Sequence, residues 1–199
     1  LNLNLLQCRP FQGRRTRTID ATLSTACLEK SPLVSFGPIV GSGFAAAIGR
    51  VVIVRPSAYA RLPEGSRHEV ARSLRRIVRD QATGPVLLAG PGRWGSTMAA
   101  LGVPVSFAEI SGVTILVEIV TSTGSAIPEI SLGTHFFNDI VEADMQYIVV
   151  APSSHRESHF DEERFAALPN RLAKLAPELA SLAPVIHVVD GIPMSCIVD

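Results

Sequence analysis

Two kinds of apolar pattern alternate along the middle of the chain. Short apolar runs, typical of strands buried on both faces, occur at Val51–Val54, Val86–Ala89, Val113–Val120 and Gln146–Val150. Between these runs, apolar residues recur at helical spacing within residues 65–81 and 134–143. The alternation predicts an α/β fold with a mixed or mostly parallel sheet and flanking helices.

The first predicted helix is amphipathic. Val70 and Leu74 lie on one face, and four arginines lie on the others. Ser66 stands three residues before Glu69, which is the spacing of a capping box, and this places the start of the helix near Gly65.

The C-terminal part of the chain has a different pattern. Leucines recur at helical spacing, but Pro169 and Pro177 interrupt the series, so we predict two or three short helices there. These leucines fit either the core or an oligomer interface, and a final strand is predicted over Val185–Val189. The leucines are Leu168, Leu172, Leu175, Leu179 and Leu182.

Composition narrows the environment and the partners. Lysine plus arginine equals aspartate plus glutamate at 18 each, so the net charge is zero and a nucleic-acid partner is not expected. Cys8, Cys27 and Cys196 are scattered, which predicts neither a disulfide framework nor a zinc site and favours a reducing cytoplasm. The most apolar stretch, residues 36–54, contains four glycines, a proline and an arginine, so no membrane span or membrane partner is expected.

A glycine-rich segment after the second apolar run is the first candidate site. Its backbone N–H groups could form a nest for an anion, with Arg93 adding a bidentate phosphate contact and Trp94 stacking on a ring. The alternative is a tight turn in which Trp94 packs over the sheet and Arg93 pairs with an acid such as Glu109 or Glu118. The candidate ligand-binding residues are Gly90, Gly92, Arg93, Trp94, Gly95 and Ser96.

His135 is the second candidate. If Thr134 caps the following helix, His135 lies near the positive end of the helix dipole, which favours the neutral imidazole. Both residues then belong to the candidate phosphate site, and a catalytic role for His135 is one hypothesis. The alternative is a structural histidine fixed between Phe136 and the sheet. Four acids near these loops, Glu109, Glu118, Asp139 and Asp144, have no known metal-motif spacing, so no metal site is predicted.

Three segments resemble a known family. Leu5-Leu6-Gln7-Cys8-Arg9-Pro10 resembles the Gln-x-Arg-Pro strand that closes the ATP-grasp domain of pyruvate phosphate dikinase and phosphoenolpyruvate synthase. Two further segments resemble a C-terminal extension of bacterial PEP/pyruvate-binding-domain proteins. They are Gly90–Ser96, continued by Leu101–Val105 and Glu109–Gly112, and Ser131–Phe137.

The resemblance implies a domain organisation and a parent activity. Residues 1–10 would be the last strand of a missing ATP-grasp domain, residues 11–32 a linker, and residues 33–199 an α/β C-terminal domain. Gln7 and Arg9 would contact the nucleotide in the intact protein, which would use ATP and Mg²⁺ as a cytoplasmic phosphotransferase. The sequence has no Thr-Ser-His phosphohistidine motif. The chain, which begins with Leu1, is therefore expected to be a fragment that is inactive alone and needs no cofactor.

Two other functions remain open from the residues. One is a regulatory module that binds a phosphate-bearing small molecule or a nucleotide. The other is a structural or oligomerisation domain, for which a homo-oligomer is a possible form.

Overall fold

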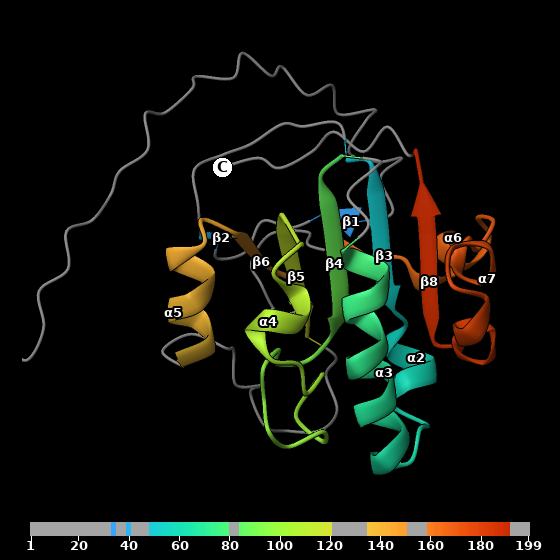
Figure 1. The fold of residues 1–199 in the computed structure, drawn as a ribbon, viewed down its shortest axis with the longest axis horizontal. Helices are drawn as coiled ribbons and strands as arrows, with labels where there is room; N and C mark the ends of the chain where they lie inside the picture. The colour runs from blue at the N-terminus through green and yellow to red at the C-terminus, as the bar shows by residue number, and fades with distance from the viewer. Residues whose placement is uncertain are drawn as a thin grey trace, which may run out of the picture.

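The apolar runs form the centre of a mixed β-sheet (Figure 1). The structure is a computed structural model that describes residues 33–34, 39–40, 48–79, 84–120, 135–150 and 159–191. Within these residues, six strands pair in the order β2-β6-β5-β4-β3-β8, and a separate pair joins β1 to β7. The strands are β1 (Leu33–Val34), β2 (Ile39–Val40), β3 (Arg50–Val54), β4 (Val86–Pro91), β5 (Ile115–Ile119), β6 (Gln146–Val150), β7 (His159–Phe160) and β8 (Ile186–Asp190).

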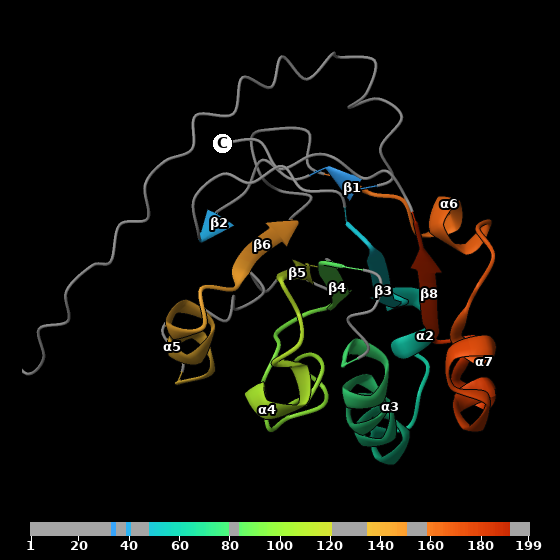
Figure 2. The same ribbon diagram turned by 45° about the horizontal axis from the view of Figure 1, so that its top comes forward.

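Strands β3 to β6 are parallel and follow one another across the sheet in sequence order. Since crossovers between parallel strands are right-handed, a sequence order without reversal places the connecting helices on one face. Figure 2 shows α3, α4 and α5 on that same face. The helices are α2 (Pro56–Tyr59), α3 (Glu64–Val78), α4 (Phe107–Ile110), α5 (His135–Glu142), α6 (Glu162–Ala166), α7 (Leu172–Leu175) and the 3₁₀ helix η1 (Pro177–Leu182).

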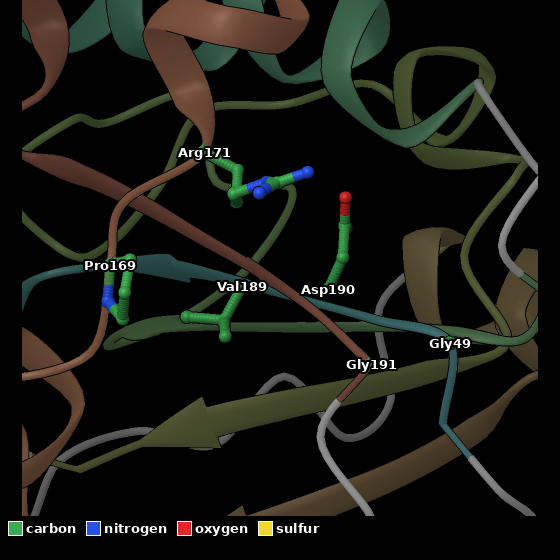
Figure 3. A pocket seen from close by; sticks show the side chains of 6 residues that line it. All are labelled: Gly49, Pro169, Arg171, Val189, Asp190 and Gly191. Carbon is green, nitrogen blue, oxygen red and sulfur yellow. The ribbon is translucent and has the colours of Figure 1, made fainter.

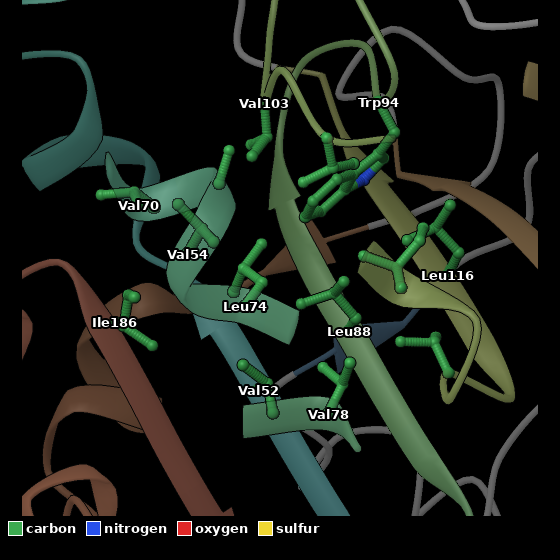
Figure 4. Packing of buried hydrophobic residues seen from close by; sticks show 14 of the residues in the cluster. Val52, Val54, Val70, Leu74, Val78, Leu88, Trp94, Val103, Leu116 and Ile186 are labelled. Carbon is green, nitrogen blue, oxygen red and sulfur yellow. The ribbon is translucent and has the colours of Figure 1, made fainter. Parts of the chain in front are cut away.

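The alternation of side chains along each strand divides the core between the two faces of the sheet. Val52, Leu88 and Leu116 pack toward the helices together with Leu74 and the ring of Trp94 (Figure 4). The other face buries an apolar layer that includes Val51, Val117 and Ile148, against which Phe165 of α6 packs. Every residue of β3, β4 and β5 is buried, as expected for strands covered on both faces.

The C-terminal tail closes the edge of the sheet at β3. Strand β8 runs antiparallel to β3, and the side chain of Asn170 fixes the chain that precedes β8. Its Nδ2 donates to the carbonyl oxygens of Ala183 and Ile186 at 3.2 and 2.9 Å. Its Oδ1 accepts from the N–H groups of Leu172 and Val188, both at 3.0 Å. One amide therefore ties α7 and the 3₁₀ turn to β8.

The expected fold class is confirmed: the sheet is mostly parallel, with flanking helices and a helical C-terminal segment. The predicted capping box at Ser66 is wrong, because α3 begins at Glu64 with Pro63 at its N-cap and no side chain bonds the cap. The same Ser-x-x-Glu spacing caps α4 instead, where the Glu109 carboxylate accepts from the Ser106 N–H and hydroxyl at 2.7 and 2.9 Å.

The domain boundaries at residues 10 and 32 lie outside the described residues. Leu33 and Val34 already pair with β7, and Ile39 and Val40 pair with β6. In the part of the chain that the structure describes, no helix has both the length and the apolar character needed to cross a membrane.

Candidate functional site

The glycine-rich segment begins inside a strand. Gly90 and Pro91 pair with Glu118 and Ile119 of β5, so β4 extends two residues beyond its predicted end. A Cβ atom on Gly90 would lie 2.6 Å from a ring carbon of Trp94. Glycine is therefore required here for the indole to lie on the strand, rather than for a ligand to approach it.

Trp94 is a core residue. Only 1% of its surface is exposed, and its indole N–H donates to the Val117 carbonyl oxygen at 3.0 Å. The ring lies among Val54, Val103 and Leu116 of the helix-side core (Figure 4). This burial agrees with the tight-turn interpretation, because a buried ring has no free face on which a base could stack.

The backbone donors of the following turn are already used. The N–H groups of Gly92, Arg93 and Gly95 donate to the carbonyl oxygens of Ile119, Leu101 and Val103 at 2.9, 2.9 and 3.2 Å. An anion nest needs such N–H groups to converge on a ligand. Instead, the Arg93 and Gly95 groups hold the turn against residues 101–103, and the Gly92 group holds it to the end of β5. We name residues 92–105 the Trp94 loop.

Neighbouring elements hold the far side of the Trp94 loop. The Tyr59 hydroxyl donates to the Gly102 carbonyl oxygen at 2.9 Å, and an Arg67 guanidinium nitrogen donates to that of Ala99 at 3.0 Å. Arg67 also lies over the Tyr59 ring, 5.3 Å from its centroid. Burial raises the pKa of Tyr59 to about 12, and nearby Arg67 opposes that rise. Tyr59 therefore stays a hydrogen-bond donor.

His135 is the first residue of α5, and its side chain is exposed. The site hypothesis placed the Gly90–Ser96 segment and the turn before α5 side by side. A Cβ atom on Gly95 would collide with the ring of Phe136, so Gly95 lies against the first turn of α5. Gly133 and Thr134 lie outside the described residues, as do Gln7 and Arg9.

Ser96, another predicted site residue, stabilises the loop that contains it. Its hydroxyl bonds the carbonyl oxygen and the N–H of Met98, both at 3.1 Å. Of the nearby acids, Glu118 is fully buried and accepts from the Tyr147 hydroxyl. Within the described residues, no group of three or more histidine, cysteine, aspartate or glutamate side chains could hold a metal ion.

A polar cluster that was not predicted lies at the carboxyl end of β3. The Arg55 guanidinium donates to Glu162 at 3.1 Å, and the Ser57 N–H donates to the same carboxylate at 3.0 Å. The Ser57 hydroxyl also bonds Glu162. Glu162 thus joins the start of α2 to α6, which indicates a structural role for the cluster.

A cavity of about 460 Å³ opens at the opposite, amino edge of the sheet, where β3 begins and β8 ends (Figure 3). Side chains of Arg171 and Asp190 point toward each other across it, above an apolar wall that includes Val189. The lining residues are Gly49, Pro169, Arg171, Val189, Asp190 and Gly191.

The charges around this cavity are asymmetric. Asp190 accepts from Arg50 through both of its oxygens, at 2.7 and 3.3 Å, and Arg50 is only 2% exposed. This bidentate pair neutralises Asp190 from the core side. Arg171 is exposed and its backbone N–H is fixed to the Val188 carbonyl oxygen at 2.8 Å. The cavity therefore presents one guanidinium whose charge the Arg50–Asp190 pair does not cancel.

Sequence reasoning missed this cavity because its lining comes from distant segments. Gly49 precedes β3, whereas Arg171 and Asp190 lie more than a hundred residues later. The Asp-Gly pair at the end of β8 is a common turn pattern and marks no site by itself. Only the pairing of Arg50 with Asp190 in register brings these segments together.

The geometry defines an α/β domain with a cavity at the amino edge of its sheet. No family model, curated protein or solved structure matches this chain.

Proposed function

We propose that this chain is a non-catalytic, ligand-binding domain of a larger phosphotransferase of the pyruvate phosphate dikinase and phosphoenolpyruvate synthase type. The proposed ligand is a small organic anion that carries a carboxylate or phosphate group, bound in the cavity at Arg171. The observation that carries the proposal is this uncancelled guanidinium in a cavity with an apolar wall. The parent protein would supply the ATP site, and the chain alone would not turn over ATP.

The size and lining of the cavity support a metabolite-sized ligand. Small-molecule sites in proteins commonly enclose about 300–1,000 Å³ and combine apolar walls with a few polar groups. Val189 and Pro169 supply apolar surface, and Arg171 supplies the anion contact. A charge-assisted hydrogen bond of this kind contributes about 1.5–3 kcal/mol, which is enough for weak, reversible binding of the kind that regulation uses.

Titration of the chain with phosphate, phosphoenolpyruvate and ATP, followed by amide NMR shifts, tests the proposal. We expect shifts at Gly49, Val189 and Gly191. Replacing Arg171→Ala should weaken binding at least about tenfold, because it removes the charged contact. The matched control is Lys174→Ala, which removes an exposed cation of α7 that does not line the cavity. Equal weakening by both variants, or no shifts at millimolar ligand, would contradict a specific site.

A structural role is the second candidate, and the Trp94 loop favours it. The backbone N–H groups of Gly92, Arg93 and Gly95 and the indole N–H are bonded within the domain. That arrangement suits a rigid scaffold. Ligand titration separates the two candidates, since a scaffold would show no saturable shifts around the cavity.

A further inference from the structure

The outer surface of the helix layer is charged in a one-sided way. Helix α3 buries Val70, Leu74 and Ile77 against the sheet and exposes a row of arginines on its other side. This basic row consists of Arg72, Arg75, Arg76 and Arg79. Arg76 pairs with Glu178 of η1 at 3.1 Å, whereas no acid among the described residues pairs with Arg72 or Arg75.

The basic row works against the helix that carries it. Like charges four residues apart, as in Arg72 with Arg76, destabilise a helix by a few tenths of a kcal/mol. Interaction with the helix dipole offsets this cost for Arg75 and Arg76 in the last turn. It does not do so for Arg72, one turn earlier. Glu69, exposed three residues before Arg72, offsets part of the repulsion there. The four arginines still outnumber this acid, so the surface is suited to an acidic partner.

The complementary charge lies on the same helix layer. Asp139 and Glu142 of α5 are exposed, as is Asp144 directly after the helix. Helix α4 lies between α3 and α5 and contacts both (Figure 1). Its exposed residues are small: Ser106, Ala108 and Ser111. Positive and negative charges are therefore separated across this one face, in a chain whose net charge is zero.

We infer that this face associates with a second copy of the chain through a two-fold axis that passes through α4. A half-turn about an axis that lies in the interface, parallel to the helices, places α3 of one copy on α5 of the other, and the same contact forms twice. The small residues of α4 let the two layers approach at the centre.

The lengths of the two charged rows agree with this arrangement. Arg72 and Arg79 are seven residues apart, or about 10.5 Å along the helix axis. Helix α5 has 8 residues and is therefore about 12 Å long. Both helices connect parallel strands on the same face of the sheet, so the half-turn makes α3 and the partner's α5 run parallel. The chain's lack of net positive charge favours a second copy over a polyanion such as a nucleic acid.

Sedimentation velocity of the 199-residue chain tests the inference. We expect a monomer–dimer equilibrium that weakens between about 20 mM and about 500 mM salt, because exposed ion pairs are screened. Arg72→Glu with Arg79→Glu should raise the dimer dissociation constant at least about tenfold, and so should Asp139→Lys with Glu142→Lys. Arg164→Glu, on α6 at the other face of the sheet, is the control and should leave it unchanged.

Mixing the two double variants gives the decisive result. In the mixed pair both contacts again join an acidic helix to a basic one, so dimers should return although each variant alone is monomeric. Recovery also shows that both variants are folded. A monomeric wild-type chain at low salt would overturn the inference. So would a dimer that the reversals do not affect, or a mixture that stays monomeric. The test is independent of the Arg171 cavity.

Discussion

The two edges of the sheet differ in how they use their polar groups. At the carboxyl edge, the Trp94 loop bonds the N–H groups of Arg93 and Gly95 to its own carbonyl groups, bonds that of Gly92 to β5, and buries its tryptophan. At the amino edge, Arg171 remains exposed beside a cavity. The first region carries the more conspicuous sequence motif, and the second carries the group that is available to a ligand.

This contrast explains what the glycines of the motif do. Gly92 and Gly95 have positive φ angles of 62° and 72°, and Gly90 and Gly102 leave room for a ring and for a peptide group. Each glycine is required by contacts within the protein. A glycine-rich turn is therefore equally consistent with close packing and with close approach of a ligand.

The largest expected effect comes from Gly102→Ala. The new Cβ atom would collide with the backbone of Arg93, which cannot move without breaking the loop. We expect a loss of about 3 kcal/mol in the free energy of unfolding, measured by urea denaturation. The control Gly65→Ala has open space in α3 and should stabilise the protein by about 0.5–1 kcal/mol. A tolerated Gly102→Ala would show that the loop is not rigid.

An intermediate effect is expected at the amino edge. Asn170 lies between the cavity-lining residues Pro169 and Arg171, and Asn170→Ala removes the four hydrogen bonds of its side chain. This loss should cost about 2–3 kcal/mol. It should also weaken ligand binding at the cavity, because Arg171 loses its fixed position. The exposed Asn138→Ala should change stability by less than about 0.5 kcal/mol. If Asn170→Ala binds the ligand as tightly as the parent does, ligand binding does not depend on the position that Asn170 gives to Arg171.

The smallest effect is a dependence on pH that arises in the tail. His187 is 5% exposed, and its Nε2 donates to the Leu168 carbonyl oxygen at 3.0 Å. Burial lowers the pKa of His187, the bond to Leu168 opposes the shift, and Arg55 adds to it. The unfolded chain therefore binds this proton first, and stability falls as pH drops below about 6.5.

His187→Gln keeps a donor for Leu168 but does not titrate. Thermal unfolding between pH 5 and pH 8 should show a flatter profile for this variant than for the parent. The exposed His135→Gln should retain the parent profile. If both variants retain it, the acid sensitivity does not originate at His187.

The fold could be predicted because it depends on local patterns. Each predicted strand from Val51 to Val150 matches a strand, and the proline-interrupted leucines form short helices. The Ser-x-x-Glu spacing at residue 66 failed because Pro63 fixes the first turn of α3 earlier than the serine. The position of Trp94 could not be read from the motif, because its burial depends on Gly90 lying beneath the ring.

The cavity could not be predicted for a different reason. Its lining residues become neighbours only when β8 pairs with β3, and nothing local marks that pairing. The neutral composition also concealed the separation of arginines on α3 from acids on α5, because a total charge carries no information about its position.

The pairing of β3 with β8 also has a consequence for how the chain folds during synthesis. Arg50 and Asp190 are 140 residues apart, so β3 leaves the ribosome long before its outer partner. Until β8 is made, β3 exposes an unpaired edge to other nascent chains. Contacts of such long sequence separation also slow folding. Conditions that slow translation between β3 and β8 should therefore favour aggregation of this protein over its folding.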